Sequence, residues 1–213
     1  MRTEDLIQSL SADTRAIPRY AAERRLATGL LLGGLAALAV MVPWMGFRDD
    51  LPGAMMTFSF AMKWAYTISL ALLALLVTHH IARPDATGLR HARLIAIPFG
   101  LLVVAAIVEL SSTPVGGWMP MWLGGSWREC SARVAVLSIP VFAGMLWAFR
   151  ALAPTRLTAA GAAAGLASGA CAATVYGLHC PEVSATFVLT WYSLGMVLAA
   201  ALGALVGPKL LRW

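Results

Sequence analysis

Two cysteines, Cys130 and Cys180, are the residues of this chain whose chemistry and placement are most specific. Each lies at the edge of an apolar run, and a tight turn joins the two runs. We therefore expect both thiols at the same end of neighbouring antiparallel helices. There they could form a disulfide, which needs α-carbons about 4.4–6.8 Å apart, or as thiolates bind a soft cation such as zinc or cadmium. A purely structural disulfide, or two unconnected cysteines, is equally open on sequence alone.

The candidate third metal ligand is His179, which directly precedes Cys180. Adjacent residues are poorly placed to chelate one ion, although Glu129 and Glu182 also flank the cysteines. The third cysteine, Cys171, lies about 13 Å deeper along the same helix and is predicted to be a small packing residue. We expect no required cofactor, and at most a regulatory zinc or cadmium ion at the cysteine pair.

Three ionisable residues, Lys63, Glu109 and Arg133, fall within or near apolar runs. Charges are costly in hydrocarbon, so such groups usually pair or face a wet cavity. We predict an ion pair between Lys63 and Glu109, with Arg133 joined to Glu129 one helical turn away. These pairs would either hold the helices together or form an ion pathway. A small transporter or channel using Lys63 and Glu109 is therefore the alternative function.

The first residues of the chain predict a short amphipathic helix. Thr3 can cap it, and the acidic first turn that follows suits the helix dipole. One face of the helix is apolar and consists of Leu6, Ile7 and Leu10. Ile17 and Pro18 would end it. This face has no partner within the chain, so it would lie on membrane lipid or dock into a groove on another protein.

The rest of the chain has the composition of a polytopic membrane protein. Of its 213 residues, 60% are hydrophobic and only 12% are charged, which excludes an ordinary soluble domain. Six apolar spans are predicted, at about residues 26–44, 54–77, 94–110, 130–149, 161–178 and 185–206. The fold class is therefore all-α, a bundle of six transmembrane helices. We divide the chain into an arm (1–25), a six-helix domain (26–207) and a short tail (208–213).

The distribution of positive charge predicts the orientation of these spans. Twelve of the sixteen Lys and Arg residues lie before the first span, after the last, or in alternate gaps. Cationic segments stay in the cytoplasm, so both termini are predicted to be cytoplasmic and the cysteine pair to face the other compartment. No cleavable signal peptide opens the chain. The basic residues flank the spans, which favours anchoring to anionic lipid over direct nucleic-acid binding.

Three local features refine this arrangement. Gly161, Gly165 and Gly169 are each four residues apart, which lets helix backbones approach closely and predicts a central helix. The stripe is expected to pack helices within one chain, with a homodimer contact as the alternative. Pro140 predicts a kink in the fourth span. Residues 111–129 are rich in tryptophan, which is typical of a segment at the membrane surface.

No motif of an enzyme site is present in the sequence. There is no C-x-x-C, no H-E-x-x-H, no phosphate-binding loop and no G-x-S-x-G. A thiol oxidoreductase would be expected to need the first of these. We therefore predict that the protein is not an enzyme.

Several stretches taken together resemble the NrsF family of integral-membrane anti-sigma factors. They are EDLIQSLSADTRAIPR near the start, GGSWREC at the fourth span, RALAPTRLTAAGAAAGLASGACAATVYGLHCPE across the fifth, and the terminal WY and GPKLLRW. The likeness covers nearly the whole chain, and the two blocks that carry the cysteines are its most specific part.

This resemblance implies a bacterial inner-membrane regulator with six spans. Its cytoplasmic N-terminus would hold an extracytoplasmic-function (ECF) sigma factor inactive, and a periplasmic cysteine pair would respond to heavy-metal or oxidative stress. Carried over to this sequence, the pair matches Cys130 and Cys180, and the arm matches roughly residues 3–19. The assignment of Leu6, Ile7 and Leu10 to sigma-factor binding rests on the helix face alone.

Overall fold

The computed structural model describes residues 3–12, 18, 20–82, 90–150, 152 and 154–211, and within these residues it contains helices and no strand. The predicted all-α class is therefore confirmed. The elements are α1 (Thr3–Ala12), α2 (Ala21–Met45), α3 (Leu51–Ala54), α4 (Phe58–Ile81), η1 (Arg90–Ile95), α5 (Ala96–Ser112), α6 (Val115–Leu123), α7 (Trp127–Phe149), α8 (Leu157–Tyr176), α9 (Ala185–Phe187), the π-helix η2 (Val188–Tyr192) and α10 (Ser193–Leu210).

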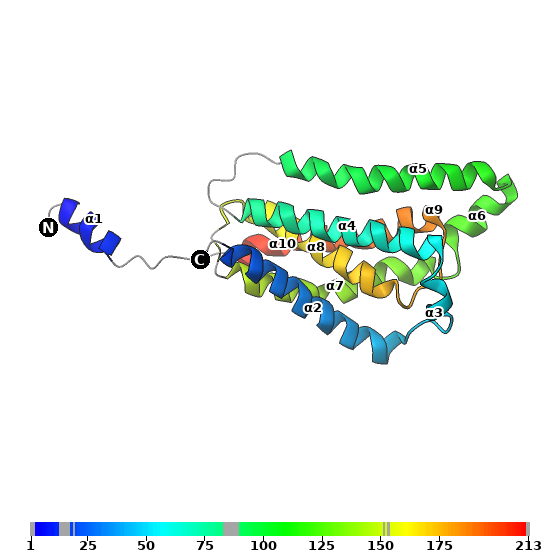
Figure 1. The fold of residues 1–213 in the computed structure, drawn as a ribbon, viewed down its shortest axis with the longest axis horizontal. Coiled ribbons are helices and arrows are strands. Elements are labelled where there is room, and N and C mark those ends of the chain that lie inside the picture. Colours follow the sequence, from blue (N-terminus) through cyan, green and yellow to red (C-terminus); the bar gives the residue numbers. More distant parts are fainter. Residues whose placement is uncertain are drawn as a thin grey trace.

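Six helical segments are long and apolar enough to cross a membrane, which is the number that the sequence predicts. Figure 1 shows α2 beginning and α10 ending at the same end of the bundle, which we call the termini end. The short helices α3, α6 and α9 lie at the opposite end, which we call the far end. In hydrocarbon a helix satisfies its own backbone hydrogen bonds, so long apolar helices are the expected solution for this sequence.

The centre of the bundle is α8, which is the most buried of the six segments. Its glycines face α10: a Cβ added at Gly161 would overlap the carbonyl of Gly203, and one added at Gly165 would overlap the carbonyl of Ala199. The two helices therefore touch backbone to backbone, as the four-residue spacing predicts. The stripe packs helices of one chain, and α10 leaves no room there for a second copy.

A similar contact joins α2 to α7. Gly29 lies against the backbone of Gly144, and Gly33 lies against the backbone of Val141. This contact brings α7 close to the first span, next to α8 and α10. Helix α7 runs on through Pro140 to Phe149.

A larger residue in the α8–α10 contact should therefore destabilise the bundle. We expect Gly161→Val to lower the free energy of unfolding by about 1–3 kcal/mol, because the added methyl groups would force two backbones apart. The measurement is unfolding of the purified protein in detergent, followed by circular dichroism. Gly100→Val on α5 is the matched control, since a Cβ there meets nothing within 4 Å. Equal effects of the two substitutions would contradict the contact.

Helix α5 packs more loosely than its neighbours. Its buried residues are Pro98, Leu102 and Ala106, which are spaced four apart along one face. An apolar groove of about 540 Å³ lies between α4 and α5. In Figure 1, α5 runs along the outside of the bundle and joins α6 at the far end. This helix is therefore held chiefly through its ends.

The helix boundaries differ from the predicted ones by a few residues at most ends, and two of these differences have a physical reason. Helix α2 begins at Ala21 and includes Arg24 and Arg25, because a helix can continue past the hydrocarbon while long basic side chains reach the headgroups. The tryptophan-rich segment contains its own helix, α6, which is continuous in hydropathy with α7. The position of this segment at the membrane surface stays a prediction.

The predicted helix of the arm is present as α1, and Figure 1 shows it apart from the bundle. Of the three residues assigned to its apolar face, Ile7 has a described side chain, which is 61% exposed. The side chains of Leu6 and Leu10 lie outside the described part of the structure. An exposed isoleucine on a detached helix is available for a partner.

Candidate functional site

The structure brings Cys130 and Cys180 together at the far end of the bundle. Cys130 is in the first turn of α7, and Cys180 is in the segment that leads from α8 into the first residues of α9, which we call the 178–186 loop. Both are free thiols and both are fully buried. Their sulfurs lie within hydrogen-bonding reach of each other. Two thiols from different elements can therefore react with one agent or with each other.

The surroundings of the pair are aromatic and almost dry. Tyr176 and Tyr192 are fully buried, and their rings contact each other at 5.7 Å between centroids. The hydroxyl of Ser126 lies 3.8 Å from the sulfur of Cys180. The hydrogen bond from Cys130 lowers the pKa of the Cys180 thiol, and the positive charge of Lys63 adds to this effect against the cost of burial. Cys180 is therefore the more acidic thiol of the pair.

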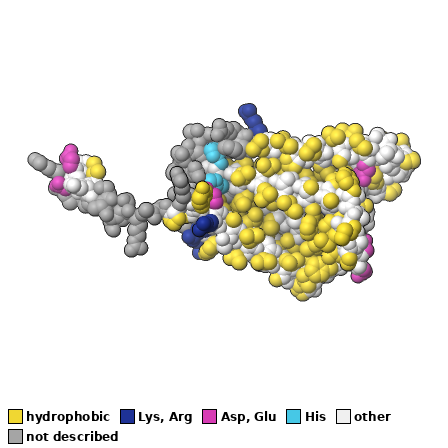
Figure 2. Space-filling view, viewed as in Figure 1, with side chains coloured by type: hydrophobic (Ala, Val, Ile, Leu, Met, Phe, Trp, Pro, Cys, Tyr) yellow, Lys and Arg dark blue, Asp and Glu magenta, His cyan; other side chains and the backbone are white. Residues whose placement is uncertain are grey.

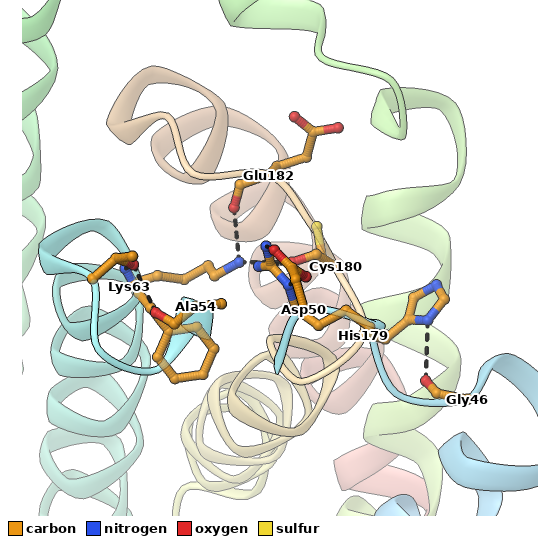
Figure 3. Close-up of polar contacts among 10 residues, drawn as sticks. Gly46, Asp50, Ala54, Lys63, His179, Cys180 and Glu182 are labelled. Atoms are coloured by element: carbon orange, nitrogen blue, oxygen red, sulfur yellow. Dashed lines mark hydrogen bonds and ion pairs between the residues drawn. The ribbon is translucent and has the colours of Figure 1, made fainter. Parts of the chain in front are cut away.

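Lys63 is the most buried charged group of the site, with 1% of its surface exposed. Its ammonium donates hydrogen bonds to the carbonyl oxygen of Cys180 at 3.0 Å and to that of Glu182 at 2.8 Å. Arg48, which pairs with Asp50, also donates to the carbonyl of Cys180, at 3.3 Å. Figure 3 shows Lys63 of α4 and Asp50 of the segment after α2 close to Cys180 and Glu182 of the loop.

Glu109 contacts the same loop further along. A single oxygen, Oε2, accepts hydrogen bonds from the hydroxyl of Ser184 at 2.8 Å and from the backbone N–H and hydroxyl of Thr186, both at 3.0 Å. The carboxylate thus caps the start of α9, where unpaired N–H groups favour a negative charge. This is the polar attachment of α5 at the far end.

The predicted ion pair between Lys63 and Glu109 is therefore not formed. The loop offers backbone carbonyl acceptors to the lysine and one N–H and two hydroxyl donors to the glutamate, so different groups of the loop satisfy each charge separately. Neither residue lines the groove between α4 and α5. The predicted pair of Arg133 with Glu129 is present, and Arg133 also contacts the ring of His179 at 3.2 Å.

His179 does not join the thiols as a third metal ligand. Its Nδ1 lies 3.1 Å from the carbonyl oxygen of Gly46, and its Nε2 faces Arg133. Figure 3 shows the ring pointing toward Gly46. Both ring nitrogens are thus engaged elsewhere, because adjacent side chains leave the backbone in different directions. Among the described residues no three His, Cys, Asp or Glu side chains are grouped for a metal ion. The described side chains available to bind a soft cation here are therefore the two thiols.

Two features of the site escaped the sequence analysis. The carboxylate of Glu182 accepts from the N–H groups of Gly125 and Ser126 at 2.8 and 3.2 Å, which ties the loop to the beginning of α7. The π-helix η2 places the carbonyl of Trp191 where the hydroxyl of Ser131 donates to it at 2.8 Å. Such π-helical turns often occur at functional sites. The glycines before Ser126 were the available signal for the first feature; we found none for the second.

Comparisons with known proteins show the family of this chain. Residues 10–213 match the family described as NrsF, negative regulator of sigma F. The chain belongs to the NrsF family. It is 43% identical to the anti-sigma-F factor NrsF of Caulobacter vibrioides and 37% identical to the probable anti-sigma-F factor NrsF of Azospira oryzae, over the full length of each chain. No solved structure matches it.

Membership of the NrsF family decides the class of function. The protein is an anti-sigma factor, a regulator and not an enzyme, as the resemblance implies. The transporter alternative has no support from these relatives. It is also disfavoured by the separate hydrogen-bond partners of Lys63 and Glu109.

Proposed function

We propose that this anti-sigma factor holds an ECF sigma factor through its N-terminal arm and releases it when Cys130 and Cys180 react with a heavy metal or an oxidant. In this proposal the protein lies in the bacterial inner membrane, surrounded by lipid. Its arm is in the cytoplasm and its cysteine pair faces the periplasm. The protein contacts no nucleic acid itself.

The observation that carries the proposal is the position of the two thiols. They come from separate elements, face each other, and lie at the end of the bundle opposite the termini. A purely structural role for buried cysteines would not require two free thiols in mutual reach. A soft metal, or loss of two electrons and two protons to an oxidant, would join the first turn of α7 to the 178–186 loop.

The charge distribution supports the orientation. In Figure 2 the Lys and Arg side chains visible on this face lie toward the termini end of the bundle, whereas acidic side chains appear at both ends and on α1. Twelve of the sixteen Lys and Arg residues lie, in the sequence, before the first span, after the last, or in alternate gaps. Cationic segments resist translocation, which favours a cytoplasmic arm.

The energy required of the signal is modest. A tenfold lower affinity for the sigma factor needs about 1.4 kcal/mol of coupling free energy between the cysteine pair and the arm. Metal–thiolate binding releases far more than this, about 10–16 kcal/mol at structural zinc sites. The metal or oxidant can shift the bundle only if it favours the state that releases the sigma factor over the state that holds it.

The test is binding of a candidate ECF sigma factor to the purified full-length protein in lipid nanodiscs. We expect binding without cadmium ions and release when they are added. Ile7→Asp should weaken binding by about tenfold, because it puts a charge in place of the exposed apolar side chain that would contact the sigma factor. Ser9→Asp, which adds the same charge to another side of α1, is the matched control. Unchanged binding of the Ile7 variant would contradict docking through this face.

A further inference from the structure

Lys63 is the one charged side chain among the buried polar residues of the described structure. Burying a charge inside an apolar bundle is costly, and such groups are generally retained for a function. Among the described residues, no carboxylate forms an ion pair with this ammonium. Its described hydrogen-bond acceptors are two backbone carbonyls, and both belong to the loop that carries Cys180.

The two carbonyls that Lys63 holds lie on either side of Pro181. Proline fixes its own backbone torsion and donates no hydrogen bond, so the loop is stiff at this point. Lys63 extends from α4, and its ammonium also lies 5.6 Å from the ring of Tyr192. From the other side, the carboxylate of Glu182 ties the loop to Gly125 and Ser126, directly before α7. The loop backbone is thus fixed between two helices while the Cys180 side chain faces Cys130.

We propose that Lys63 is the positioning residue of the thiol pair. Its ammonium hydrogen-bonds to the carbonyls of Cys180 and Glu182 and thereby holds the Cys180 sulfur close to the Cys130 sulfur. The inference rests on the proposed function, in which this pair is the sensing element. An ammonium suits the task because it has three donors and makes stronger hydrogen bonds than a neutral group in a dry site.

The test measures how fast the two thiols join. The full-length protein in nanodiscs, with Cys171→Ser to leave two thiols, is treated with diamide. Two thiols give one disulfide, and the azo bond of diamide takes up two electrons and two protons to become a hydrazine. The disulfide is quantified by mass spectrometry of the non-reduced protein. We expect Lys63→Met to slow its formation about tenfold or more, because proximity sets the rate, and Lys63→Arg to restore most of it.

Thr67→Val is the matched control. Thr67 is buried on the next turn of α4, and its described hydrogen bonds are to α4 and to Thr174 of α8 rather than to the loop. Its rate should equal that of the parent protein. If Lys63→Met does not fold, Lys63→Gln, which is shorter and uncharged, replaces it. A parental rate in the uncharged variant, equal slowing in Lys63→Arg, or equal slowing in Thr67→Val would each overturn the inference.

This result separates the inference from the proposed function. Disulfide formation in the purified protein does not depend on a sigma factor or on signalling. Slow joining in Lys63→Met together with normal stress responses in cysteine variants would refute cysteine sensing and leave the positioning role standing. Disulfide formation at the parental rate in Lys63→Met, together with cysteine variants that no longer respond to stress, would refute the positioning role and leave cysteine sensing standing.

Discussion

Deletion of residues 1–20 should leave the cognate sigma factor permanently active. The truncation removes α1 and its exposed face but keeps every residue of the helix that begins at Ala21. Loss of a whole docking helix should cost at least about 3 kcal/mol of binding, more than a hundredfold in affinity. Transcription from a sigma-dependent promoter, measured in cells without added stress, should therefore rise to the induced level and no longer respond to cadmium.

The comparison requires equal amounts of the full-length and truncated proteins in the membrane, which an immunoblot against a C-terminal tag can establish. An arm of the same length made of glycine and serine should behave like the deletion, because it offers no apolar face. Low transcription in cells that contain normal amounts of the truncated protein would show that the sigma factor binds elsewhere.

Replacement of either cysteine of the pair should abolish most of the stress response. Cys130→Ser and Cys180→Ser keep the size of the side chain, but a hydroxyl neither forms a disulfide nor binds a soft cation well. We expect induction of the promoter by cadmium or diamide to fall about tenfold or more in each variant, with low transcription before stress. The loss of both responses would follow from loss of one shared thiol pair.

Cys171→Ser is the control for these substitutions. The sulfur of Cys171 lies against Gly34 of α2, away from the pair, and its removal should leave induction unchanged. Full induction in both Cys130→Ser and Cys180→Ser would rule out sensing by this pair. The function of the arm would be unaffected by that outcome.

The helices were predictable because long apolar helices leave a strong signal in the sequence. Runs of apolar residues of sufficient length predict the six spans, and the spacing of Gly161, Gly165 and Gly169 predicts that α8 lies at the centre. The meeting of Cys130 and Cys180 followed from the same pattern. The tight turn between α7 and α8 puts their far ends side by side.

The partners of the charged groups were not predictable in the same way. Pairing Lys63 with Glu109 assumes that opposite charges in an apolar bundle seek each other, whereas both reach the 178–186 loop. The sequence does not show in which direction the carbonyl groups and the N–H groups of a loop will point. The same gap explains why the ring of His179 was assigned to the thiols rather than to Gly46 and Arg133.

The abutting backbones of α8 and α10 restrict how this chain can change over evolution. In most protein cores, a residue that grows on one side can be offset by one that shrinks on the other. At Gly161 and Gly203 both partners already have the smallest side chain that exists. Neither position has a rescuing second substitution across the contact, so the two should vary among descendants of this sequence far less than the apolar residues around them.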